Sequence, residues 1–215
     1  MIAPTLHPGG PDERAVLAWR FPTPVRALSS APVRGGFTLL GWLVNIEVDS
    51  AHHRHDLAVH VAEVAARLGL PGSGAGLLTA APVAQVCRAE DGGVLVDVTV
   101  GVTRPTWAAG PDNSWSSPVT SESGVRRPET INTVVQLPVA LSPAAAVNAV
   151  VTATEAKCQA LLEAGVPGTG TASDAIVVLW PAAGEPEDFC GPRSTWGARL
   201  ARAVLAATAD GLDHQ

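Results

Sequence analysis

The sequence predicts a single α+β domain, built from a mixed, mostly antiparallel sheet and about three principal helices. Short apolar segments recur between turns rich in Gly and Pro, which is typical of strands. Three longer segments show helix signals, either apolar residues three and four apart or a capping residue at the start. Hydrophobic residues make up 47% of the 215 residues and charged residues 16%, so the chain can fill a sizeable core.

The first half of the chain contains most of the predicted strands. Residues 1–14 are expected to be a disordered tail, and the domain is expected to span 15–212. A helix is predicted over 53–68, because its apolar residues follow the three-four spacing. The pair Gly92-Gly93 predicts a hairpin turn. Strands are predicted at 15–20, 25–28, 37–48, 76–80, 83–88 and 94–103.

The second half begins with a long polar connection, 105–128, which contains Trp107 and Trp115. Its length is more typical of a functional loop than of a plain link between elements. Two Trp in such a loop suggest a large apolar ligand, and the alternative is that they anchor the loop to the core. The sequence leaves both interpretations open.

Two strand–helix–strand units follow from the remaining elements. Strands at 131–141 and 175–180 flank a helix that begins at the Ser142-Pro143 capping signal and ends before Gly165. A final helix is predicted over 195–209. The unit 42–82 has the same element order, and Asn45 and Asn132 lie near the starts of the two units. This arrangement suggests an internal duplication with a site between the halves.

Charge and cysteine content exclude several classes of protein. The net charge is −6 and the basic residues form no cluster, so nucleic acid binding is disfavoured.

The sequence also bears on the location of the protein. No apolar run reaches the roughly 18 residues of a membrane helix, and no signal peptide is recognisable, so we expect a cytoplasmic protein. Three cysteines without a CxxC pair favour a reducing compartment and give no structural zinc pattern.

Four histidines in the first half of the chain are candidate metal ligands. His52, His53, His55 and His60 are close in sequence, but no second Cys or His cluster supplies further ligands, and there is no HExxH. We therefore predict no metal and no organic cofactor. Cys190 and His214 offer an alternative, a Cys–His arrangement of the protease type.

The densest group of polar residues lies in the second unit. Glu155 and Lys157 are predicted to lie on opposite margins of the packed stripe of the helix. From helix geometry alone, the favoured interpretation is that both are boundary residues whose side-chain stems cover apolar surface. The Gly-Thr-Gly-Thr segment 168–171 could stabilise an anion or oxyanion through backbone N–H groups and Thr hydroxyls. Taken alone, the segment is more typical of a turn between a helix and a strand. The predicted packed stripe consists of Val147, Val150, Val151, Thr154, Cys158, Leu161 and Leu162.

Together these segments resemble the adenosylcobinamide amidohydrolase family. The resemblance covers residues 27–212, and the most specific combination is Thr-Glu-Ala-Lys at 154–157 with Gly-Thr-Gly-Thr at 168–171 and Asp174. Two positions depart from the family pattern: Glu129 stands where the family has Gly, and Thr103-Arg104 replaces a Ser-Asn pair. Further matching segments are 29–31, 35–36, Asn45, 78–81, 130–135 and 196–197.

The resemblance implies hydrolysis of adenosylcobinamide to adenosylcobyric acid and aminopropanol, in corrinoid salvage. The alternatives are a non-catalytic corrinoid-binding module and an amidohydrolase for another small amide. Glu155 is the expected base acting on water, with Asp174 as second choice. Lys157 is expected either to hold a charge partner or to polarise the carbonyl. In a rival scheme, Thr130 or Thr154 attacks directly. The expected substrate-binding residues are Asn45, Thr79, Thr130, Asn132, Thr154, Thr169 and Thr171.

Overall fold

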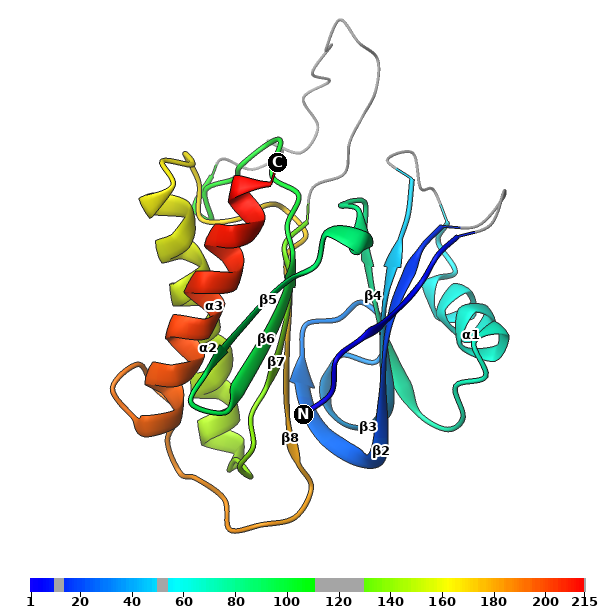
Figure 1. Ribbon diagram of the computed structural model, residues 1–215, viewed down its shortest axis with the longest axis horizontal. Coiled ribbons are helices and arrows are strands. Elements are labelled where there is room, and N and C mark those ends of the chain that lie inside the picture. Colours follow the sequence, from blue (N-terminus) through cyan, green and yellow to red (C-terminus); the bar gives the residue numbers. More distant parts are fainter. Residues whose placement is uncertain (10–13, 50–53, 111–129, 215) are drawn as a thin grey trace, which may run out of the picture.

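The computed structural model describes residues 1–9, 14–49, 54–110 and 130–214, and it confirms the predicted α+β class. One mixed sheet has the strand order β4-β3-β2-β8-β7-β6-β5, and β1 pairs with the free side of part of β2 (Figure 1). Its pairs are antiparallel except for β3–β4 and β7–β8. The strands are β1 Thr5–His7, β2 Val16–Ser29, β3 Gly36–Glu47, β4 Gly74–Thr79, β5 Cys87–Asp91, β6 Val94–Thr99, β7 Asn132–Gln136 and β8 Ala175–Pro181, and the helices are α1 Leu57–Arg67, the short 3-10 turn η1 Val83–Gln85, α2 Pro143–Glu163 and α3 Thr195–Asp213.

The long strand β2 divides the sheet into two halves. Its pairing with β3 shifts register between Arg20 and Val25, across a segment that contains two Pro, which cannot donate to the ladder. Only the second part of β2 pairs with β8. The half formed by β5–β8 and the half formed by β1–β4 therefore face each other, with α2 and α3 outside one and α1 outside the other (Figure 1).

The space between the half-sheets is filled by an apolar cluster with polar links. The cluster includes Leu17, Leu43 and Leu77 from one half and Val134 and Val177 from the other. Polar links cross the same space: the indole of Trp19 donates to Asp97 Oδ2 at 3.0 Å. Further clusters lie under α1 and under the α2–α3 pair.

Helix α2 buries a different face from the predicted one. Val147, Val151 and Leu162 are about half exposed, whereas the buried face is rich in Ala. The prediction was wrong because both faces are apolar, and the small Ala side chains allow α2 to approach α3 and the sheet closely. The buried residues of α2 are Ala145, Ala146, Ala149, Thr152, Ala153, Ala156, Lys157, Ala160 and Leu161.

Several other elements differ from the predictions. Residues 5–7 form β1 against β2, so the expectation of a disordered tail is wrong there. The predicted strand 83–88 is instead η1 followed by the start of β5. The Gly92-Gly93 turn is confirmed, and both glycines have positive φ, 52° and 94°. Among the described residues, no helix has the length and apolar character needed to cross a membrane.

Both strand–helix–strand units are present, as β3–α1–β4 and β7–α2–β8, and each contains a parallel strand pair. The two asparagines are not equivalent positions in these units. Asn45 lies near the end of β3, whereas Asn132 is the first residue of β7. The unit resemblance therefore concerns element order, and the asparagines meet for another reason, described below.

Candidate active site

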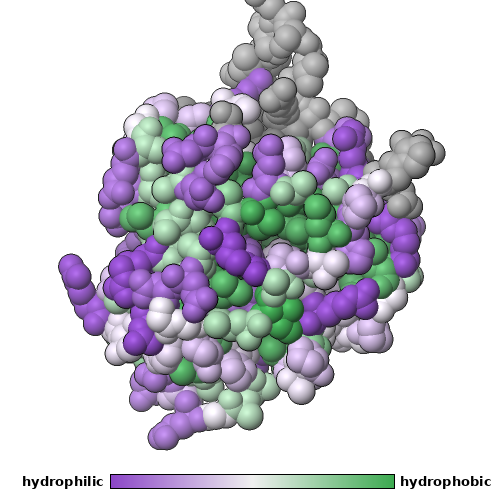
Figure 2. Space-filling view, in the orientation of Figure 1, coloured by the Kyte–Doolittle hydropathy of each residue, from purple (hydrophilic) through white to green (hydrophobic). Residues whose placement is uncertain are grey.

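One edge of the folded sheet collects most of the predicted site residues. At this edge β6 ends and β7 and β8 begin, as the pairing of Asn132 with Thr99 and Ala175 shows. The paired ends of β3 and β4 reach the same edge, where Asn45 of β3 hydrogen-bonds to Asn132. The surface seen in the same orientation has hydrophilic and hydrophobic residues interspersed (Figure 2). The predicted residues at or next to this edge are Asn45, Thr79, Thr130, Asn132, Lys157, Thr169, Thr171 and Asp174.

A charged pair forms the centre of this edge. Lys157 Nζ contacts Asp174 Oδ2, and the side chains are only 7% and 12% exposed. Lys157 is on the buried face of α2, and Asp174 immediately precedes β8. Among the described residues, Asp174 is the partner that compensates the burial of the Lys157 charge.

The Asp174 carboxylate is fully engaged. Its Oδ1 accepts hydrogen bonds from the Ile131 backbone N–H at 2.9 Å and the Thr171 hydroxyl at 2.6 Å. Its Oδ2 accepts from the Thr171 backbone N–H at 3.1 Å, in addition to Lys157. Because a carboxylate offers about four acceptor positions, Asp174 has no obvious capacity to accept a further proton donor without losing one of these contacts.

Gly170 allows the Gly-Thr-Gly-Thr turn to close over the pair. A Cβ at this position would collide with Asp174 Oδ2 and Lys157 Nζ. Any other residue would therefore push the turn or the ion pair out of place. This glycine is the local reason why the turn, α2 and β8 can meet here.

A pair of hydroxyls lies beside the charged pair along the chain. Thr130 Oγ1 and Ser173 Oγ are 2.8 Å apart, with Thr130 buried and Ser173 exposed. Two backbone hydrogen bonds to Gly101 hold Thr130 at the end of β6. The sequence reasoning missed Ser173, although its position directly before Asp174 was a usable signal.

The two predicted asparagines hydrogen-bond to each other between the half-sheets. Asn132 Nδ2 donates to Asn45 Oδ1 and to the Leu78 carbonyl, both at 3.0 Å, and Asn45 Nδ2 donates to Thr99 Oγ1 at 3.0 Å. Both amide hydrogens of Asn132 are thus used within the protein. The Thr79 hydroxyl accepts from the Ala81 backbone N–H at 3.0 Å. In this structure the hydrogen bonds of the two asparagines join the half-sheet that contains β3 and β4 to the half-sheet that contains β6 and β7.

Trp107 lies next to the Gly-Thr-Gly-Thr turn. Thr106 and residues 169–170 exchange backbone hydrogen bonds of 2.8 and 2.9 Å, and the Ala108 N–H donates to Thr169 Oγ1 at 3.0 Å. The chain on both sides of Trp107 is therefore fixed, yet Trp107 is 52% exposed. Trp115 and Glu129 lie outside the described residues.

Glu155 and Thr154 are not part of this cluster. Both are exposed on the outer face of α2, and the Thr154 hydroxyl donates to the Val150 carbonyl one turn earlier at 2.9 Å. Glu155 is two residues from Lys157, which is about 200° around a helix. The expectation that Glu155 borders the packed face is therefore wrong, although Lys157 is buried.

The Cys190–His214 arrangement is not formed. Cys190 is fully buried among the residues under α2 and α3, and its burial raises the pKa of the thiol to about 11. His214 instead lies near Asp210 and Cys87. A neutral, buried thiol is not an activated nucleophile.

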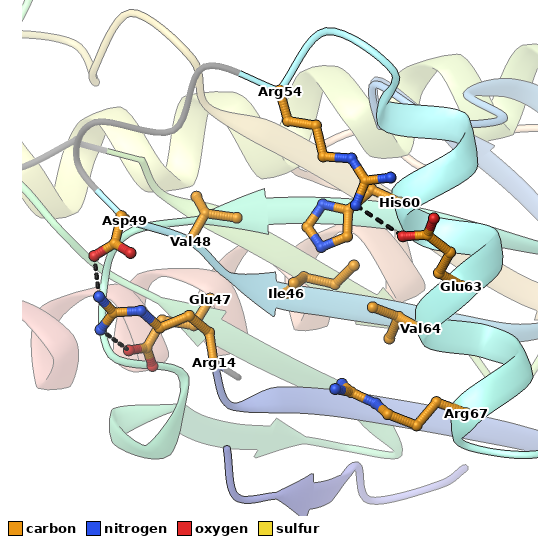
Figure 3. Close-up of a pocket in the computed structure, with 10 residues that line it drawn as sticks. All are labelled: Arg14, Ile46, Glu47, Val48, Asp49, Arg54, His60, Glu63, Val64 and Arg67. Atoms are coloured by element: carbon orange, nitrogen blue, oxygen red, sulfur yellow. Dashed lines mark hydrogen bonds and ion pairs between the residues drawn. The ribbon is translucent and has the colours of Figure 1, made fainter. Parts of the chain in front are cut away.

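A separate cleft of about 440 Å³ lies between α1 and the end of β3 (Figure 3). Its charges are paired: Arg14 with Asp49, and Arg54 with Glu63 at 2.8 Å. The hydrogen bond from Arg54 lowers the pKa of Glu63. His60 lines this cleft and His55 is exposed, while His52 and His53 lie outside the described residues.

Comparisons with known proteins agree on one family. A family model described as adenosylcobinamide amidohydrolase matches residues 5–215, nearly the whole chain. A protein of Methanosarcina mazei named adenosylcobinamide amidohydrolase is 26% identical over 193 residues, which are 86% of this chain and 88% of that protein.

Proposed function

Because the chain belongs to the adenosylcobinamide amidohydrolase family, we propose that it hydrolyses the amide bond that joins aminopropanol to a side chain of the corrin ring of adenosylcobinamide. The products are adenosylcobyric acid and aminopropanol, and the reaction serves corrinoid salvage in the cytoplasm. The observation that supports this function best is the buried Lys157–Asp174 pair, which adjoins the Thr130–Ser173 hydroxyls at one sheet edge.

Lys157 is proposed to polarise the substrate carbonyl. An ammonium group has three N–H donors, and among the described residues only Asp174 accepts a hydrogen bond from Lys157. The remaining donors are available to a carbonyl oxygen. Amide hydrolysis places negative charge on that oxygen in the transition state, and a fixed cation in a buried site stabilises such charge strongly.

Asp174 is proposed as a positioning residue rather than as the base. Its four hydrogen bonds hold Lys157, the Thr171 turn and the start of β7 in one arrangement. A base that abstracts a proton from water would first have to give up one of them. The proposal therefore replaces the expected base Glu155, which lies on the opposite face of α2.

The Thr130–Ser173 pair is proposed to provide the attacking group. In the covalent route, Thr130 Oγ1 bonds to the amide carbon, the C–N bond breaks, and aminopropanol leaves with the proton. Water then hydrolyses the ester. In the other route, the two hydroxyls order the attacking water. A mass increase by the corrinoyl group on a peptide containing Thr130, after rapid quenching, distinguishes the covalent route.

Trp107 is proposed to contact the corrinoid. A corrin ring is a large, largely apolar surface, and aromatic side chains provide much contact area at little loss of conformational freedom. Trp107 is half exposed on a fixed backbone next to the turn that holds the charged pair. Of the two predicted roles for this Trp, ligand contact fits that exposure better than anchoring the loop.

A substrate panel tests the proposed function. The purified protein is incubated with adenosylcobinamide and with small unrelated amides, and the products are separated by chromatography. We expect adenosylcobyric acid and aminopropanol from adenosylcobinamide alone. Unchanged adenosylcobinamide that remains bound would support the corrinoid-binding module instead, and cleavage of only the unrelated amides would support a different amidohydrolase.

A further inference from the structure

The C-terminal end of α3 brings together three side chains that are typical metal ligands. Ligand atoms of Cys87, Asp210 and His214 all lie within 4.8 Å of one another. We propose that these three residues bind one zinc ion. Thiolate, imidazole and carboxylate are the groups that bind Zn²⁺ in proteins, and a thiolate with an imidazole disfavours Mg²⁺ and Ca²⁺.

The fold builds this cluster from two elements that are distant in sequence. Asp210 and His214 are four residues apart at the end of α3 and therefore lie on one face of its last turn. Cys87 is the first residue of β5. Gly211 permits the close approach of α3, because a Cβ there would collide with Val100 and would lie 3.7 Å from Cys87 Sγ.

The surroundings suit a site that exchanges its metal with solvent. Cys87 is buried, whereas the side chains of Asp210 and His214 are 55% and 62% exposed, so an ion can reach the thiol from the outer side. His214 Nδ1 lies 2.6 Å from the Asp210 carbonyl oxygen. A proton on Nδ1 donates to that carbonyl and leaves Nε2 with its lone pair, which is the usual state of a zinc-bound histidine.

Three protein ligands leave a fourth position of a tetrahedral zinc ion to water. The site lies on β5 and α3, while Lys157 and Asp174 belong to α2 and the approach to β8. The zinc ion therefore fastens the last turn of α3 to the sheet, and the proposed hydrolysis has no step through it. This inference is independent of the proposed function.

Zinc binding to the full, metal-free chain is measured by equilibrium dialysis with quantification of bound metal. We expect one zinc ion per chain, and at least about tenfold weaker binding in each of Cys87→Ser, Asp210→Asn and His214→Ala. The control variants Cys158→Ser and His55→Ala should bind like the unchanged chain. Absence of stoichiometric zinc, or binding that survives both Cys87→Ser and His214→Ala, would overturn the site.

Cobalt substitution adds a readout specific to the thiolate. Co²⁺ bound by Cys87 should give a thiolate charge-transfer absorption that disappears in Cys87→Ser, and zinc but not magnesium should raise the melting temperature. His214→Ala changes an exposed residue, so it keeps the test decisive even if Cys87→Ser folds poorly. A cobalt spectrum without any thiolate band, or one unchanged in Cys87→Ser, would contradict the proposal.

Discussion

Lys157, the only lysine in the chain, forms an ion pair with Asp174 at a position where both side chains are almost buried. An unpaired charge at such a position is costly, so each residue depends on the other. The pair also joins three parts of the fold, because Asp174 holds the Thr171 turn and the Ile131 backbone. Changes to this junction should therefore affect activity more than changes elsewhere on α2.

Gly170→Ala should lower the turnover of adenosylcobinamide by about tenfold or more, because the added methyl group displaces Lys157 or Asp174. Steady-state kinetics measure the effect. Gly41→Ala is the matched control, since a Cβ at Gly41 would meet only backbone oxygens at 3.4 Å or more. Normal turnover in Gly170→Ala would show that the geometry of the pair does not matter for the reaction.

Glu155→Gln should leave turnover within about twofold of the unchanged chain, because Glu155 is exposed on the outer face of α2. Glu163→Gln, another exposed carboxylate of the same helix, serves as the comparison. A large loss of turnover in Glu155→Gln, with Glu163→Gln normal, would restore Glu155 as the base and would count against the proposed role of the Lys157 edge.

The Asn45–Asn132 bond should contribute to stability. Each asparagine changed to Ala should lower the free energy of unfolding by about 1–3 kcal/mol, because buried polar partners are left without hydrogen bonds. The double variant should lose less than the sum of the two, as expected for residues in contact. Urea unfolding measures the three values, with Asn148→Ala on α2 as control. Strict additivity would mean that the two side chains are not coupled.

Trp107→Ala should weaken corrinoid binding by about tenfold or more, because it removes a large aromatic contact. Titration of the corrinoid against each variant measures the affinity. Phe189→Ala, which removes an aromatic side chain of similar exposure, should bind normally. Equal affinities for Trp107→Ala and the unchanged chain would remove Trp107 from the substrate site.

The sequence predicted the strand–helix–strand units, because turn residues and a capping signal mark these elements. The expected site residues came mainly from the family resemblance, and most of them lie along one edge of the sheet. It did not predict which face of α2 is buried. Periodicity favoured the larger Val and Leu side chains, but close packing against α3 selected the Ala face and placed Lys157 inside. Glu155 therefore lies on the exposed face of α2 and not, as the sequence had predicted, beside the packed face.

Contacts between residues far apart in sequence were also beyond prediction. Trp19 and Asp97 meet only because β2 bends and brings the two half-sheets together. Cys87 and His214 approach each other only because α3 packs on β5. Such pairs depend on tertiary packing, which local patterns of residues do not encode.

The turnover of adenosylcobinamide by Lys157→Met tests the central claim most directly, with corrinoid affinity measured separately. A second variant, Lys157→Met with Asp174→Asn, removes the remaining buried charge and keeps the test informative if the single variant is unstable. Both variants should lose about a hundredfold or more in turnover while they retain the fold and most of the corrinoid affinity. A folded variant of either kind that keeps turnover within about tenfold of the unchanged chain would contradict the account.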